Sequence, residues 1–291
     1  MKAATTVRGW CRTAIIGFLA LLSAVLPAQS IWLDRNSKKS VALEFLKPNF
    51  DEDMGIKSTY ALFASLRLPI SPSINLAIEL PISHVVYQDY DFNWDVYNDL
   101  YFFRMREKSE TAIGNPYIGF ETSTGKKAFL EMGLHIPLAS DKKFRALAAG
   151  LFSDLDRLEA FGSEVLPLHL SLNYDHREAS GFSIRLRGGP DLWINTDSEQ
   201  GSDETELYMH YSAQLGYENV QFCFLAGITG KWWVTGEDMD FGERTFHQLG
   251  FEAGLKFGRI HPGIHLRLPL DDDLSEVLDS VIGLNCSVQF E

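Results

Sequence analysis

The sequence predicts an all-β fold, an antiparallel transmembrane β-barrel of about twelve strands with short periplasmic turns and long outer loops. Two observations predict it: apolar and polar residues alternate through most of the chain, and short and long connections alternate between the segments. A third observation excludes a helical membrane protein, because beyond the N-terminal region no stretch approaches the roughly twenty apolar residues of a spanning helix.

The first thirty residues are typical of a secretory signal peptide. Lys2, Arg8 and Arg12 precede an uncharged apolar run over residues 14–26, and Pro27-Ala28-Gln29-Ser30 follows. The run is shorter than the roughly twenty residues that a spanning helix needs, so an N-terminal anchor is the weaker interpretation. We expect residues 1–30 to be the signal peptide and residues 31–291 to form one barrel domain.

The chain is acidic, with 26 Lys and Arg residues against 39 Asp and Glu residues and a net charge of −13. Phosphate binding needs a basic surface, so a nucleic-acid partner is not expected. Beyond the signal segment only Cys223 and Cys286 remain, which does not indicate a disulfide framework.

Period-two alternation predicts the strands in order. The predicted strands cover residues 39–47, 58–69, 73–84, 113–122, 127–138, 166–175, 181–193, 206–217, 219–233, 245–257, 260–270 and 280–290. Most of them reach the roughly nine to eleven residues that a tilted strand needs to cross a bilayer.

The last strand shows the alternation best. Ile282, Leu284, Cys286, Val288 and Phe290 share one face, and the small or polar residues between them share the other. In a barrel the apolar face meets lipid and the polar face lines a lumen. A secreted, soluble β-sandwich has the same alternation, with its apolar face buried, so it remains an alternative on this segment alone.

The connections favour the barrel. Short turns are expected near residues 70–72, 124–126, 175–180, 218–219 and 258–259, and long loops at 48–57, 85–112, 139–165, 194–205, 234–244 and 271–279. Outer-membrane barrels have this layout, which returns both ends of the chain to the periplasm. Aromatic residues near the segment ends are expected to form a girdle at the membrane interface. They are Tyr87, Tyr174, Trp193, Tyr217, Trp232, Trp233 and Phe290. We therefore expect the bacterial outer membrane as the location and its lipid as a partner.

A proline recurs where predicted strands end. The pattern occurs in Leu66-Arg67-Leu68-Pro69, Leu80-Pro81, Ile136-Pro137 and Leu268-Pro269, and Ile113-Gly114-Asn115-Pro116 opens another strand. With these motifs the chain resembles a broad family of outer-membrane transporter-like proteins that includes those associated with the meta pathway of phenol degradation. The resemblance implies a barrel and a transport function, and the terminal Glu291 departs from the usual terminal aromatic residue.

If the apolar faces meet lipid, charged and polar residues of both signs line the lumen. They are Glu44, Arg67, Glu79, Tyr117, Glu121, Glu131, His135, His169, Arg185, Arg187, His210, Lys231, Glu252, Lys256, His261, His265 and Arg267. They could form a conducting pathway for a solute or a plug of salt bridges, because a barrel of about twelve strands is intermediate in width. The arginines could form a basic strip, but pairing with Glu121, Glu131 and Glu252 is the favoured interpretation.

Two long loops carry further signals. Residues 85–112 are dense in aromatic and acidic residues and could fold inward, but an extension of the hairpin above the membrane is favoured. Residues 140–165 have helix-like spacing around Phe144 and from Leu151 to Phe161, which predicts a short helix at the mouth or inside the lumen.

Catalytic and metal-binding motifs are weak. His169 and Ser171 have the spacing found in outer-membrane lipid acyl hydrolases. Leu168, Leu170 and Leu172 are expected to face lipid, so the alternation places His169 and Ser171 in the lumen. The histidines are scattered, with His261 and His265 a poor pair, so no metal, cofactor or enzymatic activity is expected.

The sequence therefore predicts a channel or transporter for a small, possibly hydrophobic, solute. The alternative is a closed barrel with a structural or surface-interaction role.

Overall fold

The computed structural model describes residues 39–51, 54–95, 100–123, 127–196, 205–236 and 240–290. The predicted signal peptide, residues 1–30, lies outside the described residues, as do parts of several connections.

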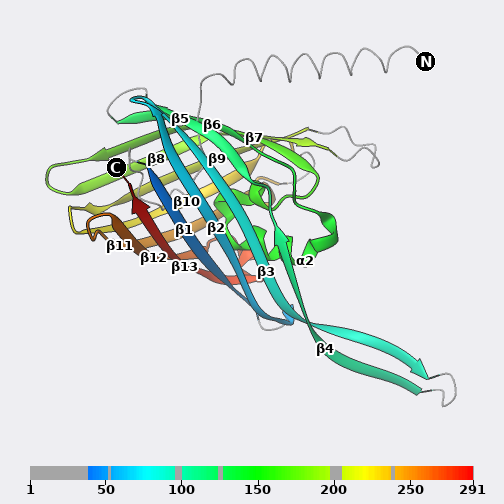
Figure 1. The fold of residues 1–291 in the computed structure, drawn as a ribbon. Coiled ribbons are helices and arrows are strands. Elements are labelled where there is room, and N and C mark those ends of the chain that lie inside the picture. Colours follow the sequence, from blue (N-terminus) through cyan, green and yellow to red (C-terminus); the bar gives the residue numbers. More distant parts are fainter. Residues whose placement is uncertain are drawn as a thin grey trace, which may run out of the picture.

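The strands form one closed antiparallel barrel (Figure 1). β1 pairs with β2 on one side and with β13 on the other, so the ring has no open edge. The strands are β1 (Ser40–Phe50), β2 (Ile56–Ser71), β3 (Ile74–Asp95), β4 (Leu100–Ile113), β5 (Tyr117–Ser123), β6 (Ala128–His135), β7 (Val165–Arg177), β8 (Phe182–Asn195), β9 (Thr205–Glu218), β10 (Phe222–Trp233), β11 (Thr245–Leu255), β12 (Ile260–Pro269) and β13 (Leu278–Gln289).

The ring counts 12 strands because β4 and β5 occupy one position in it. β5 pairs with the first part of β3 and β4 pairs with the second part. Gly114-Asn115-Pro116 interrupts the ladder between them, where proline has no N–H to donate. The predicted barrel and its strand count are confirmed.

The sequence predicted a long loop over residues 85–112, but the structure has strands there. Most of it continues β3 to Asp95 and forms β4, and this hairpin projects far beyond the barrel (Figure 1). The favoured interpretation, an extended hairpin, is thus correct. The strand expected to open at residue 113 instead begins at Tyr117.

Short and long connections alternate as predicted. The barrel end with the short turns also carries both ends of the described chain, where the Phe290 amide donates a hydrogen bond of 2.7 Å to the Lys39 carbonyl. We call this the periplasmic end and the opposite one the outer end, following the layout of outer-membrane barrels.

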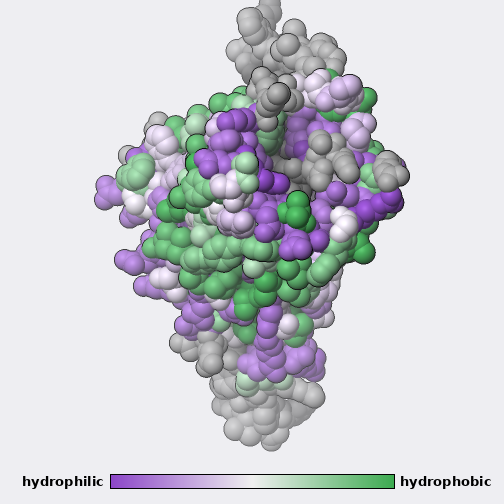
Figure 2. All heavy atoms as spheres, turned by 90° about the vertical axis from the view of Figure 1, so that its left-hand side faces the viewer, coloured by the Kyte–Doolittle hydropathy of each residue, from purple (hydrophilic) through white to green (hydrophobic). Residues whose placement is uncertain are grey.

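On the face drawn in Figure 2, an apolar belt lies between two more polar zones. On β13, the outward Ile282 and Leu284 are exposed, whereas Gly283 between them is buried, as the alternation predicts. Other exposed members of the belt are Leu43, Phe45, Ile118, Leu172, Leu186, Leu215, Phe224, Ile228, Ile264 and Leu266. A surface of this kind is stable in hydrocarbon and not in water, which disfavours the soluble sandwich.

The predicted aromatic girdle is only partly correct. Tyr174, Tyr217 and Phe290 are exposed near the periplasmic end. Trp193 instead packs on Tyr208, and Tyr208 stacks with Trp233, on the strand face that also carries lumen residues. These rings lie at the mouth of the lumen and not against lipid, because the alternation of side chains along a strand places them on its inward face.

The long segment between β6 and β7 folds into the barrel. This plug segment, residues 136–164, contains η2 (Asp141–Lys143), α2 (Phe144–Ser153) and η3 (Leu155–Ala160). The predicted helix is confirmed and lies against the inner wall. Its apolar side packs on lumen-facing residues of β1 to β4 and β13. The packed residues are Leu46, Ala61, Phe63, Val85, Ala112, Ala146, Leu147, Ala149, Phe161, Leu278 and Val281.

Two short helical turns occur in other outer connections. They are η4 (Gly242–Arg244) and α3 (Asp272–Ser275). Within the described ranges, no helix has the length and apolar character that would let it span a membrane.

A charge on the lipid face should destabilise the barrel. Leu284 lies midway along β13 and is 55% exposed on the apolar belt. We expect Leu284→Arg to lower the free energy of unfolding in lipid vesicles by about 2–4 kcal/mol, because the guanidinium would lie in hydrocarbon. Urea titration followed by heat-modifiable gel mobility measures it.

The control is Val220→Arg, in the periplasmic turn between β9 and β10, where Val220 is 88% exposed. It introduces the same charge at a solvated position and should change the unfolding free energy little. Equal effects of the two variants would contradict the lipid-facing assignment of β13.

Candidate functional site in the barrel lumen

The residues predicted to line the lumen lie on the inward strand faces. Fourteen of the seventeen are buried: Glu44, Arg67, Glu79, Tyr117, Glu121, Glu131, His135, His169, Arg185, His210, Lys231, Glu252, His265 and Arg267. Arg187, Lys256 and His261 are half-buried. The interior is therefore a charged core of both signs, enclosed by strands that are apolar outside.

The arginines pair with carboxylates and do not form a basic strip. Arg67 pairs with Glu121, and Arg187 Nη2 lies 2.9 Å from Glu131 Oε1. Arg185 Nη2 lies 3.4 Å from Oε2 of Glu218, a partner that the sequence analysis had not placed in the lumen. These pairs lie in the periplasmic half of the lumen, and the pairing agrees with the favoured interpretation.

At the centre, two charged residues of the plug segment meet the barrel wall. Arg157 Nη1 donates to Oε2 of Glu79 on β3 at 2.9 Å, and Nη2 pairs with Glu44 on β1. Asp154 Oδ1 lies 2.5 Å from Nη1 of Arg267 on β12. We call Glu44, Glu79, Asp154, Arg157 and Arg267 the arginine anchor. All five residues are buried.

The arginine anchor is stabilised by more than charge. The Arg157 guanidinium carbon lies 3.6 Å from the centroid of the Phe63 ring, and Arg157 Nε donates to Asp154 at 2.6 Å. Burial opposes ionisation of Asp154, yet Arg157 and Arg267 outweigh it and lower its pKa to about 2. Asp154 is therefore ionised at neutral pH.

A second ion-pair group attaches η3 to the opposite wall. Lys231 Nζ on β10 donates to Glu159 Oε2 at 2.5 Å and lies 3.1 Å from Asp191 Oδ2 on β8. Burial opposes ionisation of Glu159, but Lys231 prevails and lowers its pKa. We call Glu159, Lys231 and Asp191 the lysine anchor, because it attaches the plug segment to β8 and β10.

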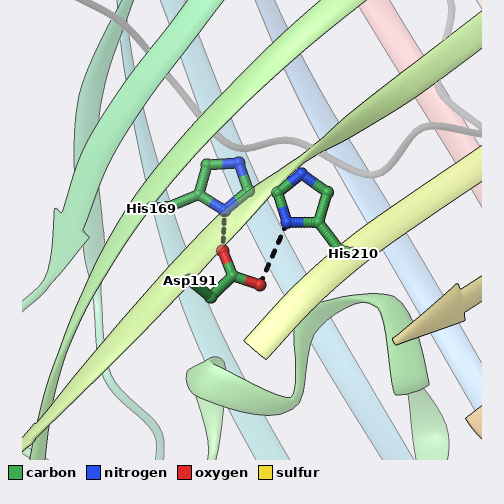
Figure 3. Close-up of side chains that lie close together, drawn as sticks. All are labelled: His169, Asp191 and His210. Carbon is green, nitrogen blue, oxygen red and sulfur yellow. Dashed lines mark hydrogen bonds and ion pairs between the residues drawn. The ribbon is translucent and has the colours of Figure 1, made fainter. Parts of the chain in front are cut away.

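Two histidines converge on Asp191 (Figure 3). Nδ1 of His169 lies 2.5 Å from Asp191 Oδ1, and Nδ1 of His210 lies 3.1 Å from Oδ2. The two rings stack with centroids 4.6 Å apart. His169 and Asp191 are opposite each other on β7 and β8, and His210 comes from the next strand, β9. We call these three residues the histidine cluster.

Asn115, in the break between β4 and β5, connects both ends of the plug segment to the wall. Its side-chain amide donates to the carbonyls of Glu159 and Gly162, at 3.0 and 2.6 Å. Its Oδ1 accepts from the amides of Leu138 and Ala139, at 2.9 and 2.8 Å. The buried Asn115 thus uses all of these groups to hold the plug segment.

Gly114 allows this close approach. A Cβ at Gly114 would overlap the Ala160 carbonyl oxygen and the Phe161 ring. The Gly-Asn-Pro motif therefore has a positional reason: glycine admits the plug segment, asparagine bonds it and proline ends the ladder.

The cavities found among the described residues differ in size and place. Two cavities of about 20 Å³ lie against Arg185, each large enough for roughly one water molecule. At the periplasmic end, the turns after β7, β9 and β11 surround an open recess of about 780 Å³. Its lining includes Arg177, Glu218, Lys256 and His261.

The sequence pattern did not identify several residues at the centre of the lumen. Asp154, Arg157 and Glu159 lie in the segment for which the spacing predicted a short helix at the mouth or inside the lumen, but the spacing did not identify them as ion-pair partners of the wall. Asp191 lies on the inward face of β8, and counting by twos from Arg185 and Arg187 would have found it.

His169 and Ser171 face the lumen, as predicted. Arg187 lies between them: its Nη2 is 3.0 Å from His169 Nε2, and its Nε donates to Ser171 Oγ at 3.2 Å. The histidine is therefore not placed to activate the hydroxyl, and neither group reaches the lipid surface.

No family model matches the sequence, and no curated protein matches it. Solved structures share its fold. An outer membrane channel from Pseudomonas putida F1 has a TM-score of 0.55 and 9% identity over 90% of this chain and 99% of that chain. The translocator domain of the autotransporter NalP from Neisseria meningitidis has a TM-score of 0.55 and 10% identity over 99% and 98%.

The shared architecture is that of bacterial outer-membrane β-barrels. The closed ring and the apolar belt independently require a bilayer, because they leave hydrocarbon-facing side chains outside and charged ones inside. Fold and surface together place the chain in the bacterial outer membrane.

Removing the Asn115 amide should loosen the plug segment. We expect Asn115→Ala to raise the labelling rate of a cysteine at Ser153, which is buried on α2, at least about tenfold. The four lost hydrogen bonds each contribute roughly 0.5–1.5 kcal/mol. The measurement is maleimide labelling in proteoliposomes, with Cys223 and Cys286 replaced by serine.

Asn49→Ala is the matched control, since the Asn49 side chain donates to Ser280 Oγ at 2.9 Å between β1 and β13 and not to the plug segment. It should leave the labelling rate unchanged. An unchanged rate in Asn115→Ala would show that Asn115 does not hold the plug segment.

Proposed function

We propose that the protein is a gated outer-membrane channel for small polar or charged solutes, closed by the plug segment. The observation that carries this proposal is the arginine anchor. It joins the plug segment to the barrel wall by charge pairs, and the same wall residues would remain as a polar lining once the segment moved.

The physics of buried ion pairs supports a releasable plug. Desolvation offsets much of the attraction within a buried pair, so such a pair adds little net stability, yet removing one partner costs about 3–5 kcal/mol. An entirely apolar contact would favour a permanent core.

The solute class follows from the lining. The expectation of a hydrophobic solute rested partly on the aromatic residues in 85–112, whose strands β3 and β4 project beyond the barrel. The lumen itself carries buried carboxylates, guanidinium groups and imidazoles. A solute that exchanges hydrogen bonds with these groups suits the lining better than an apolar one.

We also propose a more specific family relationship for the chain. The proline-tipped strands resemble the family that includes proteins of the meta pathway of phenol degradation, and the fold match to an outer membrane channel supports the resemblance. We propose no enzymatic function, because Arg187 separates His169 from Ser171.

Neutralising Arg157 should open the channel. We expect Arg157→Gln to increase the open probability in planar bilayers at least about tenfold over wild type. Glu44, Glu79 and Asp154 would lose a shared cation, which should destabilise the closed state by about 3–5 kcal/mol. Refolded protein covering residues 31–291 is used for both.

Lys57→Gln is the control. It removes the same charge from an exposed pair with Glu107, at 3.0 Å on the outer end, and should conduct like wild type. Silent bilayers for Arg157→Gln, despite verified insertion and folding, would favour the alternative, a closed barrel with a structural or surface-interaction role.

A further inference from the structure

The histidine cluster lies in a group of charges that do not balance. Asp191 and Glu159 share Lys231, and Glu131 pairs with Arg187. Counted over these five residues alone, three carboxylates face two permanent cations, so with neutral imidazoles beside them the five carry a net charge of −1. A buried excess charge is costly, so the group favours one more positive species.

The ligand atoms of the cluster already converge. One ligand atom each from His169, Asp191 and His210 lies within 4.8 Å of the others, and all three residues are buried. Both Nδ1 atoms point toward the carboxylate from neighbouring strands (Figure 3). Metal bonds of about 2.0–2.2 Å would draw such atoms together by small side-chain rotations.

The ring nitrogen of His210 that points away from the cluster has no fixed partner among the described residues. Nε2 of His210 is buried and makes no hydrogen bond within the described part of the chain. Without a metal ion, Nδ1 donates to the Asp191 carboxylate and carries the proton. A metal ion would take the Nδ1 lone pair, and the proton can then lie on Nε2, where no partner opposes it. A neutral imidazole in this tautomer is a metal ligand.

We propose that His169, Asp191 and His210 bind one divalent transition-metal ion of the zinc type inside the barrel. Two imidazole nitrogens and one carboxylate oxygen suit such ions, whereas calcium and magnesium prefer oxygen ligands alone. The three residues would leave one coordination position for water. The sequence showed no such motif because its members come from three different strands, β7, β8 and β9.

Lys231 does not block the site. Its ammonium group lies 3.1 Å from Asp191 but 2.5 Å from Glu159. When a metal ion takes Asp191, Lys231 keeps Glu159 as its partner. The lysine anchor would then hold the plug segment through a single, undivided ion pair.

Metal content after refolding tests the proposal. Untagged protein covering residues 31–291 is refolded with and without ZnCl₂, and zinc is measured after gel filtration. We expect one zinc ion per wild-type chain and none in His210→Gln. The control His261→Gln alters a histidine at the periplasmic recess, bonded to Gln289 at 3.2 Å, and should retain zinc.

The outcomes are distinct. No zinc in folded wild type would overturn the proposal and leave a proton as the compensating charge, and zinc retained by folded His210→Gln would place the ion elsewhere. Heat-modifiable mobility reports folding. If His210→Gln does not fold, Co²⁺ in wild type decides: visible absorption of a nitrogen- and oxygen-ligated ion supports the site, and its absence overturns it.

Discussion

The bilayer imposes the constraint on which the rest of this structure depends. Hydrocarbon offers no partner to a peptide N–H or C=O, so each strand must pair on both sides and the sheet must close, as β1 does with β2 and β13. Closure divides the side chains into two sets with opposite requirements. Outward positions must be apolar, and inward positions carry nearly all of the polar chemistry.

Charge compensation follows from that division. With carboxylates and cations placed together in a narrow interior, each must find a partner of the opposite sign. Some pairs lie within the wall, such as Glu44 and Arg267 at 3.2 Å, and others join the wall to the plug segment. The plug segment supplies Arg157 to Glu44 and Glu79, and Asp154 to Arg267. Plug and wall therefore form one electrostatic unit, although they are far apart in the sequence.

The interior has two sides with different characters. Beside β1 to β4, small and apolar residues such as Ala61 and Phe63 accept the apolar side of α2. Beside β7 to β10, histidines surround Asp191, and Lys231 connects this side to η3. Lys231 thus contacts both Asp191 of the histidine side and Glu159 of the plug segment.

The sequence by itself determined the barrel, because period-two alternation and alternating connection lengths are local properties: it gave the strand order and the inward residues from Arg67 to Arg267. For the connections it favoured an extended hairpin over residues 85–112, and it left open whether a helix in residues 140–165 lies at the mouth or inside the lumen. The hairpin of β3 and β4 continued strand pairing beyond the membrane, and residues 136–164 turned inward. Only the tertiary structure decided the partners of Arg157, Glu159 and Asp191, because ion pairs between distant segments depend on how the closed ring brings them together.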